Sequence, residues 1–308
     1  MKAKSNVLIA LRNILKHNST RLTPIYKSNG SANATGDNLE FFIKDMFCWN
    51  ALQYSYQEQK EMEYKKLFSW TGDSTHFPDL IIKGGAGIES KKVNDDSYST
   101  VPLNSSYPKD YITSETQNYP KDSLKNEPIL DWDTKPVIYA IGNLNTKNPQ
   151  NLNQLKSLWF VYGNTMVPKN QYYQEIIKGI RNSIQKSAQS NIDWIKSKEL
   201  ARVHGIDKLK RTNMRVRGMY ELQHPEKIFN KYINNITIPK NKSKIYVVIL
   251  DSDLNELIQD MDQEWENLSK ELDTYKTAGN LFVKNINLPD PNGIKSNLPA
   301  TIFVGYTN

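Results

Sequence analysis

The fold of this chain is decided by one stretch, Phe77-Pro-Asp-Leu-Ile-Ile-Lys-Gly-Gly-Ala-Gly-Ile-Glu-Ser-Lys-Lys92. Two short apolar-rich segments, 77–83 and 88–93, flank a glycine-rich turn, a pattern that predicts a β-hairpin. We expect residues 84–86 to form the loop and Gly87 a bulge, which would place Asp79 opposite Lys91 and diagonal to Glu89. The two carboxylates would then converge on one cation.

This hairpin carries the Pro-Asp, then Glu-x-Lys signature of a large superfamily of Mg²⁺-dependent nucleases. The triplet alone is not specific, because the chain contains four Asp/Glu-x-Lys triplets. Only Glu89-Ser90-Lys91 follows a Pro-Asp pair at hairpin distance. The alternative interpretation is a surface hairpin whose charged face is incidental.

Composition indicates a globular protein with a polyanionic partner. The chain has 308 residues, 38% of them hydrophobic, and a net charge of +7, which suits a nucleic acid. Its one cysteine, Cys48, excludes an internal disulfide and a cysteine zinc site, so we expect a reduced, cytoplasmic compartment. No stretch approaches the roughly 20 apolar residues that span a bilayer.

We expect two units along the chain. Residues 1–36 form a basic N-terminal arm with six lysines and arginines and no acid, in which apolar residues at helical spacing predict a short amphipathic helix over 7–15. Residues 37–308 form a single domain with a long loop at 94–135, which we expect to contact the partner, and an extension of helix and strands from about 234.

Hydrophobic periodicity predicts the remaining elements. We expect strands at 136–143, 158–162, 212–220 and 244–250, and helices at 37–47, 51–67, 171–186, 193–203, 225–233 and 255–275. Asp37 is a plausible N-cap of the helix 37–47. Glu40, in its first turn, either interacts with the helix dipole or completes a second cation position.

Polar residues outside the hairpin are candidates for DNA contact. The segment 103–109 combines hydroxyl, amide and ammonium donors, as a phosphate-contacting loop would, although a solvated turn has a similar composition. Two arginines at strand spacing, Arg215 and Arg217, could fork onto guanine O6 and N7, or pair with phosphates or carboxylates. The candidate phosphate contacts are Asn104, Ser105, Ser106, Lys109 and Arg202.

Beyond the hairpin motif, several blocks resemble, in order, the NgoPII-type family of type II restriction endonucleases. The similarity runs from about residue 36 to about residue 233, in the blocks 36–45, 77–92, 103–109, 198–203 and 214–219. It implies an α/β fold with a PD-(D/E)XK nuclease core, a central mixed β-sheet flanked by helices. It also implies a Mg²⁺-dependent homodimer that cuts double-stranded DNA within a short palindrome, GGCC in this family, beside a cognate DNA methyltransferase.

By motif match, the resemblance assigns the catalytic roles to Asp79, Glu89 and Lys91. Asp79, Glu89 and the Ser90 carbonyl would hold Mg²⁺, with Glu40 at a second position, and hydrolysis would leave a 5′-phosphate and a 3′-hydroxyl. Two alternatives remain: a nuclease of the same superfamily that reads structure or cuts without specificity, such as a repair enzyme or resolvase, and a non-catalytic basic DNA-binding module.

Overall fold

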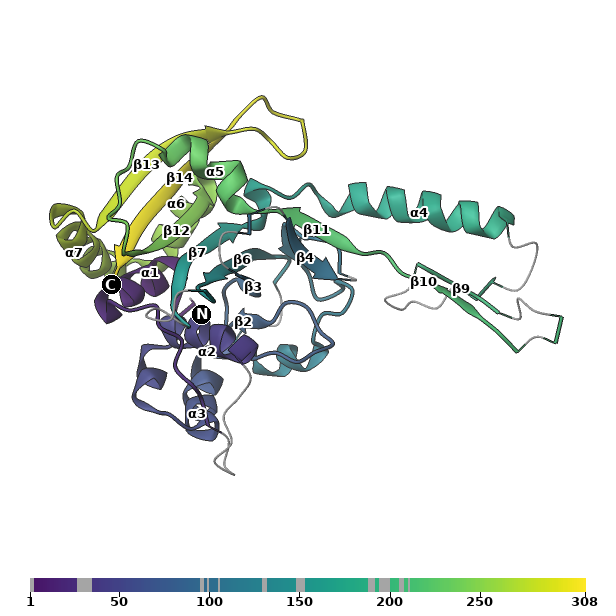
Figure 1. Ribbon diagram of the computed structural model, residues 1–308, viewed down its shortest axis with the longest axis horizontal. Coiled ribbons are helices and arrows are strands. Elements are labelled where there is room, and N and C mark those ends of the chain that lie inside the picture. The colour runs from purple at the N-terminus through teal and green to yellow at the C-terminus, as the bar shows by residue number, and fades with distance from the viewer. Residues whose placement is uncertain are drawn as a thin grey trace.

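A large mixed β-sheet runs through the body of the protein and carries the hairpin near one edge (Figure 1). The computed structural model describes residues 3–26, 35–94, 97–98, 100–104, 106–128, 132–147, 153–187, 192–193, 200–204, 208–209 and 211–308. Among these, eight strands follow one another across the sheet, and a ninth, β5 (Tyr111–Ile112), pairs with β6. Their order is β1 (Phe68–Trp70), β2 (Leu80–Ile82), β3 (Gly87–Asn94), β6 (Lys135–Leu144), β7 (Leu155–Tyr162), β12 (Ser243–Leu250), β14 (Leu298–Thr307) and β13 (Leu281–Leu288).

The central strands are buried on both faces, as their unbroken apolar runs predict. Successive side chains of a strand point to opposite faces, and β7 accordingly sends Leu158 and Phe160 into one apolar cluster and Trp159 and Val161 into the other. β3 pairs in parallel with β6, and β7 in parallel with β12, whereas the remaining neighbours are antiparallel. The predicted central mixed sheet flanked by helices is therefore confirmed.

Helices cover both faces of this sheet (Figure 1). One cluster combines sheet residues with α1 (Val7–His17), α2 (Thr35–Phe47), α6 (Asp251–Met261) and α7 (Gln263–Thr277). The opposite cluster includes Phe229 of α5 (Pro225–Ile233), whose ring stacks on Trp159. The other helices among the described residues are the 3₁₀ turns Trp49–Gln53, Lys121–Asn126 and Gly163–Thr165, and the α-helices α3 (Gln57–Leu67) and α4 (Asn170–Ser187).

The predicted N-terminal helix is an integral part of this core. Asn6 caps α1 by accepting hydrogen bonds from the backbone N–H groups of Leu8 and Ile9. The Asn13 amide donates to the Met46 carbonyl at 2.7 Å, which ties α1 to α2. Within the described residues, no helix is long and apolar enough to cross a lipid bilayer.

In the part of the chain that the structure describes, two smaller sheets lie apart from the central one. β4 (Thr100–Asn104) pairs with β11 (Tyr220–Gln223), and β10 (Met214–Val216), β9 (Ala201–Val203) and β8 (Ile192–Asp193) form a three-stranded antiparallel sheet. Together with α4, this three-stranded sheet extends away from the body (Figure 1). We call the segment 170–219 the arm.

The hairpin forms as predicted, but its register differs. The Ile82 N–H donates to the Ala86 carbonyl, which closes the three-residue loop Lys83–Gly85 with Gly84 at φ +67°. Leu80 pairs with Ile88, so Asp79 faces Glu89 rather than Lys91, and Gly87 is an ordinary strand residue instead of a bulge. The loop starts one residue earlier than predicted because Gly84 takes the positive φ that a tight turn requires.

Six other expectations were wrong. The helix predicted over 51–67 is a 3₁₀ turn at Trp49–Gln53 followed by α3, and the strand predicted over 212–220 contains β10 and only the first residue of β11. The helix predicted over 255–275 is two helices, because Asp262 takes a left-handed φ of 51° between them. The segment 193–203 has strands at both described ends, since non-local pairing with β10 outweighs a short helical pattern. The loop 94–135 contains β4, β5 and a 3₁₀ turn. Finally, α2 begins at Thr35, so Asp37 lies within the helix instead of capping it.

Candidate active site

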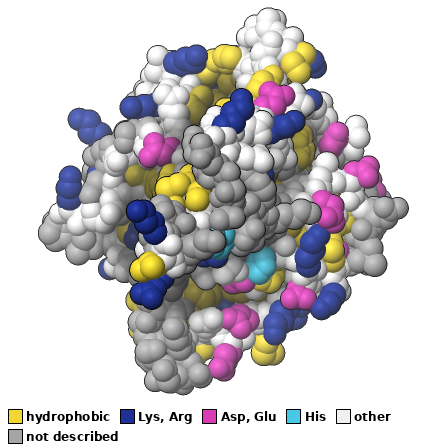
Figure 2. All heavy atoms as spheres, turned by 90° about the vertical axis from the view of Figure 1, so that its right-hand side faces the viewer, with side chains coloured by type: hydrophobic (Ala, Val, Ile, Leu, Met, Phe, Trp, Pro, Cys, Tyr) yellow, Lys and Arg dark blue, Asp and Glu magenta, His cyan; other side chains and the backbone are white. Residues whose placement is uncertain are grey.

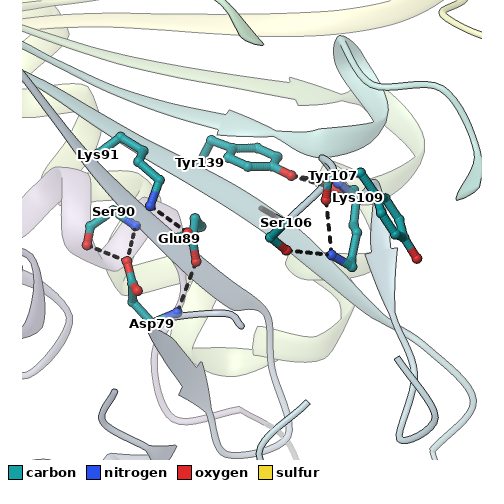
Figure 3. A network of polar contacts seen from close by, with 8 residues as sticks. All are labelled: Asp79, Glu89, Ser90, Lys91, Ser106, Tyr107, Lys109 and Tyr139. Carbon is teal, nitrogen blue, oxygen red and sulfur yellow. Dashed lines mark hydrogen bonds and ion pairs between the residues drawn. The ribbon is translucent and has the colours of Figure 1, made fainter. Parts of the chain in front are cut away.

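The two carboxylates of the hairpin face each other at the start of β2 (Figure 3). The backbone N–H of Asp79 donates to Glu89 Oε2 at 3.2 Å. In return, the N–H and hydroxyl of Ser90 donate to Asp79 Oδ2 at 2.8 and 2.7 Å. Each carboxylate is thus oriented by a backbone group of the opposite strand, so the pair is preorganised by the hairpin itself.

Lys91 completes the group from the same face of β3 as Glu89, because residues two apart on a strand share a face. Its ammonium lies 2.6 Å from Glu89 Oε1. Burial lowers the pKa of Lys91, but the Glu89 and Asp79 carboxylates outweigh it and hold this pKa above its ordinary value. Lys91 is therefore a charged donor beside the two acids.

The proximity of the two acids affects the ionisation of Glu89. Its side chain is only 9% exposed, and burial, with the nearby Asp79 carboxylate, raises the pKa of Glu89 to about 7. A divalent cation between the two carboxylates would offset this repulsion. Carboxylate oxygens are the hard ligands that Mg²⁺ prefers, so these residues fit a magnesium site.

Glu40 lies close to this pair without joining it. A side chain at Gly72 (φ +95°) would have its Cβ 2.8 Å from the Asp79 carbonyl oxygen and 3.0 Å from Glu40 Oε1, so both oxygens flank the same glycine. Lys44 holds Glu40 Oε1 at 2.6 Å. Across the described part of the chain, no group of three or more His, Cys, Asp or Glu side chains is arranged to bind a metal.

Lys109 is buried behind the site rather than displayed on a surface. It is 3% exposed, and its ammonium lies 4.1 Å from the centre of the Phe77 ring and 4.2 Å from that of Tyr107. It donates to Ser106 Oγ and to the Tyr107 carbonyl, both at 3.0 Å (Figure 3). Burial lowers the pKa of Lys109 to about 7, against the opposing effect of Glu89. A direct phosphate contact, as expected from the sequence, does not fit this placement.

Tyr139 links the Lys109 segment to the catalytic strand and was missed by the sequence analysis. Its hydroxyl accepts from the Lys109 N–H at 2.7 Å and donates to the Lys109 carbonyl at 3.1 Å. On β6, Tyr139 pairs directly with Glu89 of β3. A tyrosine within an apolar strand is expected to be a core residue, so nothing in the local sequence indicates that Tyr139 supports the site.

A second buried carboxylate supports the hairpin turn and was also missed. Glu127 accepts from the Gly84 N–H at 2.9 Å and from the Lys135 ammonium at 3.1 Å. It also accepts from the Ser69 hydroxyl on β1. Because these groups come from three separate segments, only the folded chain shows that Glu127 fixes the turn.

The remaining sequence candidates lie elsewhere. Arg202 of β9 pairs directly with Arg215 of β10, and Arg217 follows the end of that strand. All three belong to the arm. Asn104 ends β4, where its backbone pairs with Tyr220, and Ser105 lies outside the described residues. The structure therefore gathers Asp79, Glu89, Ser90 and Lys91 at one site and the arginines at another.

Comparison with known proteins places the chain in a family. The family model described as NgoPII restriction endonuclease matches residues 5–279. The chain is 31% identical over 229 residues to the type II restriction enzyme NgoPII of Neisseria gonorrhoeae, covering 73% of this chain and 76% of that protein. No solved structure matches. With the acidic pair and the lysine on one hairpin of a mixed sheet, the chain belongs to the NgoPII restriction endonuclease family and is a site-specific deoxyribonuclease.

Proposed function

We propose that this protein hydrolyses phosphodiester bonds of double-stranded DNA with Mg²⁺, within a short palindrome, and leaves a 5′-phosphate and a 3′-hydroxyl. The observation that carries the proposal is the preorganised group formed by Asp79, Glu89 and Lys91 on one hairpin. The family resemblance suggests GGCC as the recognised sequence and PD-(D/E)XK as the nuclease class.

Asp79 and Glu89 would hold the metal through their carboxylate oxygens, together with the Ser90 carbonyl. A bound Mg²⁺ ion lowers the pKa of a coordinated water and neutralises charge on a phosphate. Ser90 orients Asp79 Oδ2 through its N–H and its hydroxyl. Glu40, which lies across Gly72 from the Asp79 carbonyl, is our candidate for a second cation position.

Lys91 would act on the attacking water and on the scissile phosphate. Its ammonium is held by Glu89 at 2.6 Å, so it lies charged and oriented beside the carboxylates that would hold the metal. From there it can orient the nucleophile by hydrogen bonding and stabilise the charge that develops on the phosphate oxygens. This role requires a cation, which the raised pKa of Lys91 provides.

Base reading and phosphate contact would fall to other parts of the chain. Arg215 and Arg217 are the proposed guanine contacts, since a bidentate guanidinium matches O6 and N7. Phosphate contacts would come from the candidates Asn104, Ser105, Ser106 and Arg202. A palindrome presents each half-site once per strand, so we propose a homodimer with one active site per strand. A cognate DNA methyltransferase would protect host DNA in the cytoplasm.

The test is digestion of a plasmid of known sequence in Mg²⁺ with three variants. Asp79→Ala and Lys91→Ala should abolish cleavage yet retain site-specific binding in metal-free buffer. Lys92→Ala is the matched control, because Lys92 is exposed and points to the opposite face of β3, and it should cut like the parent. Discrete fragments that end at one palindrome are expected; unchanged cutting by Lys91→Ala, or a smear of products, would refute the proposal.

A further inference from the structure

The net charge of the protein resides in the arm. The chain has 40 basic and 33 acidic residues. The segment 170–219 contains 11 of the basic and 4 of the acidic residues, so the rest of the chain has 29 of each. The arm is thus charged +7 and the remaining 258 residues are neutral overall. A neutral body has little long-range attraction for a polyanion, whereas a concentrated positive charge attracts one strongly.

The described part of the segment 170–219 holds eight of these basic and two of these acidic residues, and its shape allows their charge to follow a duplex. α4 has 18 residues and is therefore about 27 Å long, a length along which duplex DNA carries roughly 16 negative charges. Lys178 and Lys186 of α4, and Arg215 and Arg217 beyond it, are exposed. Figure 2 views the molecule from the arm end and shows Lys and Arg side chains on this face, together with Asp and Glu side chains.

The base of the arm packs against the segment that supports the active site. The Tyr107 ring stacks on Tyr173 of α4 at 5.4 Å and meets Tyr220 of β11 edge-on at 5.9 Å. The Tyr107 carbonyl and ring also hold the Lys109 ammonium. One tyrosine therefore contacts the start of the arm, the residue that follows its end and the Lys109 ammonium, which sets the position of the arm relative to the hairpin.

We propose that the arm is the element that holds duplex DNA against the active site and supplies most of the electrostatic affinity for it. This inference rests on the proposed function and specifies which surface of the protein the DNA occupies. A second copy of the chain is the competing occupant, because Ile176 and Met219 are 63% and 69% exposed on the arm. The like charge of two arms opposes their association, so the charge distribution favours DNA.

The experiment compares two charge-neutralised double variants. Lys178→Gln with Lys186→Gln changes α4 of the arm, and Lys270→Gln with Lys276→Gln changes exposed lysines of α7, at the opposite end of the molecule (Figure 1). Both remove two positive charges. Affinity for a short random-sequence duplex is measured in EDTA over a range of salt concentrations, which excludes cleavage from the readout.

The arm variant should bind more weakly than the parent, and the slope of log K against log salt should flatten by about 1.8, since each lost phosphate contact removes about 0.9. The α7 variant should keep the parent slope. Equal slopes for the two variants would overturn the inference. The inference would also be overturned if the arm variant kept the parent slope but changed its oligomeric state in sedimentation. That result would show that the arm contacts a second copy of the chain.

Failure of this inference is separable from failure of the proposed function. The salt slope is measured without metal and does not depend on Asp79 or Lys91. If Lys91→Ala abolishes cleavage but the arm variant keeps the parent slope, the active site stands and the arm assignment falls. If the salt dependence of the arm variant flattens while Lys91→Ala still cleaves DNA, the arm binds DNA and the catalytic assignment of Lys91 is wrong.

Discussion

Replacing Glu89 with glutamine should stabilise the metal-free protein at neutral and alkaline pH. Burial and the Asp79 carboxylate raise the pKa of Glu89 from 4.5 to about 7 in the folded state. Each pKa unit corresponds to about 1.36 kcal/mol, so ionised Glu89 costs the folded protein about 3 kcal/mol. Glutamine resembles the protonated acid and avoids this cost.

The pH dependence of this effect follows from proton linkage. Below pH 4.5 Glu89 is protonated in both states, and the variant and parent should differ little. Between pH 4.5 and about 7 the folded parent retains a proton that the unfolded chain has released, so its free energy of unfolding falls as pH rises. Above pH 7 the full difference of about 3 kcal/mol should separate the two proteins.

Urea denaturation in EDTA at a series of pH values measures this difference. Glu127→Gln is the control, because Glu127 is also buried but holds the Lys135 ammonium and the Gly84 N–H. Breaking that buried pair should destabilise the protein by about 3–5 kcal/mol. Adding Ca²⁺ should stabilise the parent but not Glu89→Gln, because only the parent keeps both carboxylates. A Glu89→Gln variant less stable than the parent at pH 8, or a pH-independent difference, would refute the reasoning.

Three further changes test other parts of the site. Lys109→Met should lower the cleavage rate roughly tenfold, as loss of a supporting group typically does, but should keep the salt slope of DNA binding, since the ammonium is buried and donates to Ser106 Oγ and to the Tyr107 carbonyl; a flattened slope would instead indicate phosphate contact. Gly72→Ala should lower the free energy of unfolding by about 1–2 kcal/mol and reduce cleavage. The alanine Cβ would clash with the Asp79 carbonyl oxygen, and the φ of +95° is unfavourable for any residue with a Cβ. A variant as stable as the parent in urea denaturation would contradict this. Arg215→Ala should cost about 1–3 kcal/mol of binding at the cognate site and relax discrimination there, and equal losses on cognate and random duplexes in a competition assay would exclude base reading.

The catalytic assignment from sequence depended on residue types more than on geometry. The turn register was wrong by one residue at the loop, yet Asp79 still meets Glu89, because the observed pairing brings the two residues directly opposite. The predicted and observed pairings of Asp79 differ by two residues of the partner strand, so its side chain keeps the same face and lies near Glu89 in both. Lys91 follows from strand alternation alone.

The sequence by itself determined the hairpin and three central strands of the sheet, and which acids and lysine form the motif. Apolar runs and period-two spacing are local properties, and the strands at 136–143, 158–162 and 244–250 follow from them because a sheet buried on both faces needs nothing else. The tertiary structure alone decided the burial of Lys109, the support from Tyr139 and Glu127, and the break at Asp262. The first three depend on groups far apart along the chain, whose contacts outweigh local preference only once the chain has folded.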